Sequence, residues 1–212
     1  MRIHGGTAYS GHTQKVRIAL AEKHLTDHIP ILEVPRDQRR SAVHRARSPL
    51  CLVPVLELDD GSFLPESSAI IEYIDALFPT RPLVPADPLQ RARMHALDHY
   101  NDQALTPPVR RLWEFVFNES GSGEITPEVD AARRKIIEVC RYLDAQLGDQ
   151  PYLVGDFSIA DIAFMMRLQM FPMFGVDIPT ACAAVRAWVE RLRARPAWAA
   201  TMYPPLPPRG GG

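Results

Sequence analysis

The sequence has few cysteines, and none of them belongs to a CxxC pair. There are three in 212 residues, Cys51, Cys140 and Cys182, and they lie far apart. An odd number of widely spaced cysteines predicts neither a disulfide framework nor a zinc site, and it suits a reducing compartment. The histidines show no HExxH-type spacing either. We therefore expect no bound metal.

Long apolar runs and an excess of one charge are also missing. No stretch approaches the roughly 20 consecutive apolar residues of a membrane span, and residues 1–10 lack the apolar core of a signal peptide. The formal net charge of −1 gives no electrostatic reason to expect nucleic acid or an anionic membrane as a partner. The arginine-rich run over 36–47 contains no aromatic residue, so we interpret it as a solvated helix or loop. We expect a cytoplasmic protein whose partners are small molecules or protein surfaces.

Strand and helix patterns alternate over the first 78 residues. Strand patterns cover 2–8, 28–34, 53–58 and 63–64, and a turn over 59–62 joins the last two as a hairpin. Helical spacing covers 15–24 and 69–78. The pattern predicts a small α/β layer with a mixed sheet over 1–78.

The rest of the chain shows helical patterns. Four prolines fall between 79 and 88, so we expect a linker over 79–87. Helical periodicity over 89–118, 127–147, 158–171 and 181–195 then predicts an all-α domain over 88–202. Ser158 and Asp161 have the spacing of a capping box at the start of the third helix. Proline and glycine dominate 203–212, where we expect a flexible tail.

Pro54 stands just before a predicted strand, where it cannot donate to a ladder of hydrogen bonds. A cis peptide bond at Val53-Pro54 would turn the Val53 N–H and C=O outward, where they could pair with an extended peptide ligand. The alternative is an ordinary proline on an edge strand.

Two helix starts are candidate anion sites. At Glu66-Ser67 the free N–H groups and the helix dipole would favour a carboxylate, with Ser67 as a donor and Glu66 as an acceptor for an ammonium group. The loop from Tyr9 to Thr13 precedes the first helix, and the same field would stabilise a thiolate there. Ordinary helix capping by Ser67, and by Ser10 or Thr13, is the alternative at each place.

In order along the chain, Ser10, the helix KVRIAL, Val53-Pro54 and Glu66-Ser67 resemble the N-terminal domain of the cytosolic glutathione transferases. The resemblance implies a thioredoxin-like domain over 1–78, an all-α second domain and a homodimer. It also implies that Pro54 is cis, that Val53 binds the backbone of the glutathione cysteine and that Glu66 and Ser67 bind the γ-glutamyl group. Gln38 and Arg40 join these residues as candidate glutathione ligands.

The activating group follows from the same resemblance. Ser10 stands where the serine- and cysteine-type classes place theirs, and a hydrogen bond from Ser10 to the glutathione sulfur would favour the thiolate. Tyr9, His12 and Thr13 remain open as alternatives. The second substrate is expected to be a small hydrophobic electrophile, although helix packing or surface charge could also explain several of the candidate lining residues. These are Tyr9, His12, Tyr100, Thr106, Arg110 and Trp113.

The sequence departs from the family at Ser48-Pro49-Leu50-Cys51, where many members have Asn-Pro-x-Gly. We interpret Cys51 as a buried, inert thiol. A glutathione-dependent isomerase of the maleylacetoacetate or maleylpyruvate type and a non-catalytic interaction protein are the rival functions. Disulfide reduction of the omega type is least expected, because serine at the activating position cannot form a mixed disulfide.

Overall fold

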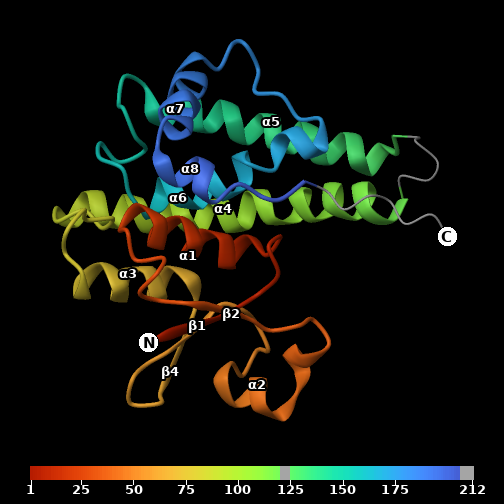
Figure 1. Cartoon of the computed structure of the whole chain (residues 1–212). Helices are drawn as coiled ribbons and strands as arrows, with labels where there is room; N and C mark the ends of the chain where they lie inside the picture. Colours follow the sequence, from red (N-terminus) through yellow and green to blue (C-terminus); the bar gives the residue numbers. More distant parts are fainter. Residues whose placement is uncertain (120–124, 206–212) are drawn as a thin grey trace.

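The computed structural model describes residues 1–119 and 125–205, and it contains the expected mixed sheet (Figure 1). Four strands lie in the order β2-β1-β3-β4, with β1 (Arg2–Gly5) parallel to β2 (Ile31–Glu33). β1 is antiparallel to β3 (Val55–Glu57), and β3 is antiparallel to β4 (Phe63–Pro65). The first strand ends earlier than predicted, because the Gly6 N–H donates to Thr13 Oγ1 at 2.8 Å.

Helices cover both faces of this sheet. α1 (Gly11–Glu22) and α3 (Ser67–Leu77) pack together on one face, whereas η1 (Gln38–Arg40) and α2 (Ala42–Arg47) lie on the other. α1 begins four residues before the predicted start, because its first turns carry the buried polar side chains of Thr13, Gln14 and Lys15. Hydrophobic periodicity does not detect buried polar residues.

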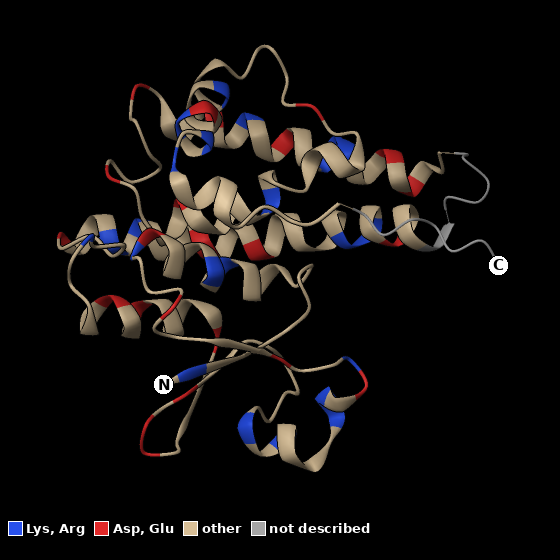
Figure 2. Ribbon diagram, viewed as in Figure 1, with Lys and Arg blue, Asp and Glu red and all other residues tan. Residues whose placement is uncertain are grey.

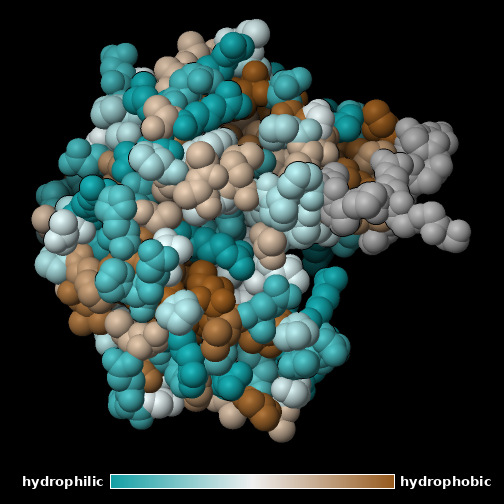
Figure 3. Space-filling model, in the orientation of Figure 1, coloured by the Kyte–Doolittle hydropathy of each residue, from teal (hydrophilic) through white to brown (hydrophobic). Residues whose placement is uncertain are grey.

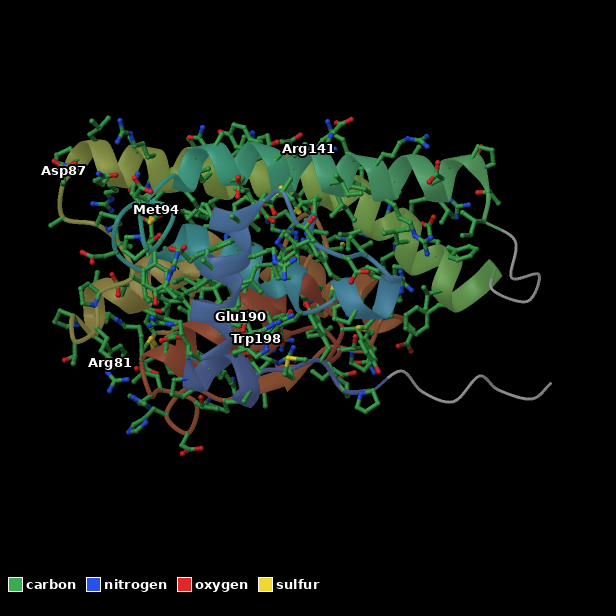
Figure 4. All side chains as sticks on the ribbon, turned by 90° about the horizontal axis from the view of Figure 1, so that it is seen from above. Arg81, Asp87, Met94, Arg141, Glu190 and Trp198 are labelled. Carbon is green, nitrogen blue, oxygen red and sulfur yellow. The ribbon has the colours of Figure 1, made fainter. Side chains whose placement is uncertain are left out.

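The second domain is all-α among the described residues. α4 (Pro88–Glu114) continues into a π-helical turn, η2 (Phe115–Glu119), and lies alongside α5 (Pro127–Leu147), as Figure 4 shows from above. Next come α6 (Ile159–Leu168), the 3-10 turn η3 (Phe171–Phe174), α7 (Ala183–Arg193) and α8 (Pro196–Ala200). α8 was not predicted. Residues 120–124, which lie between η2 and α5, are outside the described residues.

α6 is the central helix of the molecule, packed against both α1 and α4. Every residue from Ile159 to Leu168 is buried. The predicted capping box is confirmed, since Ser158 and Asp161 exchange the two expected hydrogen bonds. Asp161 also accepts from Trp188 Nε1 at 2.9 Å, and burial raises the pKa of its carboxyl to about 6.

A buried ion pair joins the two domains. Lys15 of α1 pairs with Asp98 of α4, and Lys15 Nζ also donates to Ser68 Oγ at 2.8 Å. The Ser68 hydroxyl donates in turn to Asp98 at 2.6 Å. A buried ion pair and the Ser68 hydroxyl therefore fix α1, α3 and α4 to one another.

The expected flexible tail, 203–212, begins with a residue that packs in the core. Tyr203 is only 6% exposed and belongs to the core, and its ring lies parallel to that of Tyr9, with the ring centroids 6.4 Å apart. The sequence pattern could not show this, because the contact is formed with a residue almost two hundred positions away. The remainder of the expected tail, 206–212, lies outside the described residues.

The surface is mixed in charge and polarity. In Figure 2 several arginines lie on the η1–α2 segment, and most side chains over 36–47 are exposed, as expected for a solvated segment. Figure 3 shows hydrophobic residues on this face as separate small patches. Among the described residues no helix is long and apolar enough to cross a membrane.

Candidate active site

The register of the sheet brings three distant segments to one end of it. His4 of β1 pairs with Val55 of β3, and Val55 pairs with Pro65 of β4. In antiparallel pairs the end of one strand lies beside the start of the other, so the segments after β1, before β3 and after β4 lie at the same end of the sheet. The backbone alone thus gathers the β1–α1 loop, the Val53-Pro54 segment and the start of α3.

The Val53-Pro54 peptide bond is cis, as the resemblance implied. Val53 lies outside β3, and in the described part of the chain its N–H and C=O have no backbone partner. Val53 is half-buried, so it reaches the surface at this end of the sheet. An extended peptide can pair with these two groups as a further strand would.

The start of α3 leaves its polar groups free. Glu66 is the N-cap residue at φ +74°, makes no side-chain cap hydrogen bond and is exposed. Ser67 is the first helical residue, so the alternative in which Ser67 caps the helix is wrong. A residue other than glycine at such a φ costs about 1–3 kcal/mol, and such conformations cluster at ligand sites. The arrangement presents a carboxylate and a helix N-terminus side by side.

The β1–α1 loop holds Ser10 at the start of α1. Ser10 is the N-cap residue, as the capping alternative expected, but its side chain makes no cap hydrogen bond. Its Oγ is instead hydrogen-bonded to Thr13 Oγ1 at 3.1 Å. A Cβ on Gly6 would lie 2.6 Å from Ser10 Oγ, so glycine is required there. The Ser10 hydroxyl donates to Thr13, and rotation of that hydroxyl would turn its proton toward a ligand.

Two arginines that the sequence reasoning missed hold this loop. Arg17 donates to the Gly6 carbonyl at 3.1 Å, and Arg39 donates to the Val34 carbonyl at 3.3 Å. Arg39 Nη2 is 2.9 Å from the position that a Cβ on Gly6 would take. Burial lowers the pKa of both arginines. The sequence held one signal for Arg17, which is a charged residue between the apolar Val16 and Ile18 of the predicted helix.

The predicted ligands beside Arg39 lie differently. Gln38 and Arg40 are exposed on η1, whereas Arg39 between them is half-buried. The structure therefore turns the middle residue of this short helix toward the loop that carries Ser10. A three-residue turn has no hydrophobic period from which its inward face could be predicted.

Aromatic rings gather on the second-domain side of this loop. The Tyr9 ring centroid lies 5.2 Å from that of Trp113 and 6.1 Å from that of Phe117. The Tyr9 hydroxyl donates to the Pro205 carbonyl at 2.8 Å, so it is already engaged. Phe117 and Tyr203, which complete this aromatic cluster, were not among the predicted lining residues.

Polar side chains lie beside the aromatic cluster. His12 Nδ1 is 4.0 Å from Asp102 Oδ1, and Thr106 Oγ1 accepts from Arg167 Nη2 at 2.8 Å. Burial lowers the pKa of His12, and the negative charge of Asp102 opposes that shift. His12 is therefore neutral at neutral pH and able to accept a proton. Thr13 is fully buried and accepts from the Gly6 N–H, which fits a positioning role.

Two predicted lining residues are not brought to this group. Tyr100 packs on Tyr142 of α5, with 4.4 Å between ring centroids. Arg110 has a side chain that is 76% exposed and lies 3.9 Å from Glu114 on its own helix. Both belong to other faces of α4, a distinction that depends on how the long helix is rotated.

The thiol predicted to be buried is only partly so. Cys51 is half-buried at φ +58°, whereas Cys140 and Cys182 are buried. The apolar neighbours of Cys51 suggested burial, but Leu50 and Leu52 are 73% and 57% exposed. The loop that departs from the family pattern therefore turns its apolar residues outward.

Comparisons with known proteins agree with this geometry. Residues 9–77 match the model of the glutathione S-transferase N-terminal domain, and residues 109–196 match that of the C-terminal domain. Glutathione S-transferase 2 of Saccharomyces cerevisiae is 32% identical over 194 residues, which cover 86% of this chain and 81% of that protein. The chain belongs to the glutathione S-transferase family. The predicted fold class and enzyme class, glutathione transferase, are both confirmed.

Solved structures of the family have the same fold. The structure of Gtt2 from Saccharomyces cerevisiae is 31% identical, with a TM-score of 0.77, and the match covers 95% of this chain and 100% of that one. A theta-class glutathione S-transferase from Xanthomonas axonopodis pv. citri, solved with glutathione bound, is 25% identical with a TM-score of 0.83 and coverage of 97% and 98%. In the described parts of this transferase, no three His, Cys, Asp or Glu side chains are grouped to hold a metal ion.

Proposed function

We propose that this transferase binds glutathione along Val53 and the start of α3, and that the Ser10 hydroxyl stabilises the thiolate. The observation that carries the proposal is the meeting of three groups at one end of the sheet. Two of them have no partner, the Val53 peptide unit and the N-terminus of α3, and the third is the half-buried Ser10 hydroxyl. Glutathione is an extended peptide with a γ-glutamyl end and a thiol, and it matches all three.

The chemistry follows from the charges around Ser10. The N-terminus of α1 and a hydrogen bond from Ser10 both favour a negative sulfur over a neutral thiol. Neutral His12, two residues after Ser10, is the proposed acceptor for the thiol proton. The sulfur then attacks the electrophilic carbon, a C–S bond forms, and the leaving group departs with the bonding electron pair.

The aromatic cluster supports a small hydrophobic electrophile as the second substrate. The half-buried rings of Tyr9, Trp113 and Phe117 lie next to the loop that carries Ser10, and the buried Tyr203 ring is stacked on Tyr9. Flat aromatic side chains favour stacking with an aromatic substrate. The serine-type mechanism and this substrate class are parts of the same proposal.

The decisive experiment compares Ser10→Ala with Ser62→Ala, a matched change in the exposed β3–β4 turn. Retention on immobilised glutathione and thiol consumption with 1-chloro-2,4-dinitrobenzene are measured for each protein. A lost hydrogen bond to a charged sulfur costs about 1.5–3 kcal/mol, so Ser10→Ala should lower kcat about 10- to 100-fold. Its dissociation constant for glutathione should stay within about threefold, and Ser62→Ala should behave as wild type.

The proposal fails at different points for different results. Wild-type turnover in Ser10→Ala would transfer the activating role to Tyr9, His12 or Thr13. Isomerisation of a maleyl compound without thiol consumption would favour the isomerase, and neither retention nor turnover would favour the non-catalytic protein.

We also propose that the protein is a cytoplasmic homodimer. Exposed apolar side chains on the first domain support a protein partner, including Leu50 at 73%, Val43 at 64% and Leu52 at 57% exposure. Light scattering on the purified chain should give twice the mass of one chain. A monomer at micromolar concentration would contradict the dimer.

A further inference from the structure

Arg167 is a buried cation next to the start of α1. It lies near the end of α6 and is 6% exposed, and its Nη2 donates to Thr106 Oγ1 at 2.8 Å. Its Nη1 is 3.1 Å from the position that a Cβ on Gly11 would take. The guanidinium therefore lies against the first residue of α1, one position after Ser10.

In the described part of the chain no carboxylate lies within ion-pair distance of Arg167, and Asp102 acts on its charge only from a longer distance. The other two buried lysines and arginines are paired, Lys15 with Asp98 and Lys23 with Asp75 at 2.6 Å. No such ion pair is formed by Arg167, and its Nε is buried without a hydrogen-bond partner. A buried charge without a partner is costly, so such groups are found where a ligand supplies the opposite charge.

A second polar atom without a partner lies in the same region. The Tyr203 hydroxyl is buried and makes no hydrogen bond within 1–119 or 125–205. Tyr203 and Arg167 are close enough to influence one another, and burial keeps the Tyr203 hydroxyl protonated by raising its pKa. The first N–H groups of α1 add further donors at the same place. Three kinds of donor thus meet beside the aromatic cluster.

We propose that Arg167, with Tyr203 and the N-terminus of α1, binds a carboxylate on the second substrate. The inference rests on the proposed transferase function and narrows the electrophile to an aromatic compound that carries an anionic group. The guanidinium fork matches the two oxygens of a carboxylate, and Arg167 lies against Gly11, the residue that follows the proposed thiolate ligand Ser10. The carboxylate itself takes no part in bond making.

Two aryl chlorides of the same shape test the inference. 4-Chloro-3,5-dinitrobenzoate carries the charge, and 4-chloro-3,5-dinitrobenzamide is neutral. In both, the glutathione sulfur forms a bond to the ring carbon as chloride leaves with the electron pair. After normalising to the uncatalysed reaction, wild-type kcat/KM should be at least tenfold higher for the benzoate. Arg167→Met should abolish that preference while holding amide turnover within about threefold.

Controls separate recognition from folding. Arg167→Lys keeps the positive charge and should retain part of the benzoate preference, and Arg193→Met, an exposed change on α7, should retain all of it. Equal normalised rates for the two wild-type substrates would overturn the inference. An equal loss of both in Arg167→Met would overturn it too, because it would assign Arg167 a structural role.

A binding measurement keeps the inference independent of turnover. Quenching of tryptophan fluorescence by 3,5-dinitrobenzoate and 3,5-dinitrobenzamide is titrated without any chemistry. Wild type should bind the benzoate at least tenfold more tightly, and Arg167→Met should bind both equally. If neither aryl chloride is consumed, the transferase proposal fails, and the titration still decides the anion subsite. Equal wild-type affinities would refute it.

Discussion

The two halves of the candidate active site differ in whether backbone groups or side chains form them. On the glutathione side the groups without partners are mostly backbone, the Val53 peptide unit and the N-terminus of α3, set side by side by sheet register. On the second-substrate side the groups are side chains from α1, α4, α6 and the segment after α8. A backbone site keeps its shape under many substitutions, whereas a side-chain site changes with each one.

Under the proposed function, the two halves differ in their expected role in specificity. The glutathione half accepts one invariant co-substrate, and a fixed register is enough to position it. Under the proposals above, the other half combines aromatic faces with Arg167, so we expect small changes in sequence there to alter the accepted electrophile.

The largest effect is expected at the buried Lys15–Asp98 ion pair, which joins the two domains. Lys15→Met removes the partner of Asp98, which is 6% exposed, and leaves its charge buried. The free energy of unfolding should fall by about 3–5 kcal/mol, measured by urea denaturation. The control, Lys135→Met, breaks an exposed 3.0 Å pair with Glu138 and should cost less than about 1 kcal/mol. Similar losses of unfolding free energy in both variants would show that this pair does not hold the two domains together.

The two halves also differ in how far they could be predicted from sequence. Val53, Pro54, Glu66 and Ser67 could be found because a proline before a strand and a polar helix start are local patterns. Arg167 could not, because its significance depends on the absence of a partner, which is a property of the packed structure. One signal was present, since it is the only basic residue in the otherwise mainly apolar run 159–168.

Helix boundaries show the same limit. Patterns predicted the long helices of the second domain well, but α1 was cut short because its first turns bury Gln14 and Lys15. Gln14 donates to Gln169 Oε1 at 3.0 Å, a contact across 155 positions. Tyr203 was assigned to a tail for the same reason. Buried polar and terminal residues are defined by tertiary partners, so local periodicity does not identify them.

A smaller effect concerns His12, which belongs to both halves. Burial holds its pKa below the ordinary value, and Asp102 opposes that shift, so Asp102→Asn should lower the pKa further. A histidine protonates as the pH falls through its pKa, so wild type should lose His12 as a proton acceptor only at pH values below about 6.5. An NMR titration, with His12→Gln to assign the resonance, measures both values. Asp60→Asn in the distant turn is the control. A His12 pKa that rises in Asp102→Asn would contradict the arrangement.

The smallest effect on kcat/KM is expected at Arg110, and it tests which face of α4 borders the second substrate. Arg110 is exposed and faces Glu114, whereas Trp113 packs on Tyr9, so Arg110→Ala should change kcat/KM for an aromatic electrophile by less than about twofold. Trp113→Leu should lower it about three- to tenfold, because an aromatic pair contributes about 0.5–1.5 kcal/mol beyond its buried area. Both variants are assayed with 1-chloro-2,4-dinitrobenzene at saturating glutathione, and both should keep the wild-type KM for glutathione. If Arg110→Ala has the larger effect, the electrophile lies on the outer face of α4, and the aromatic cluster is packing between the domains.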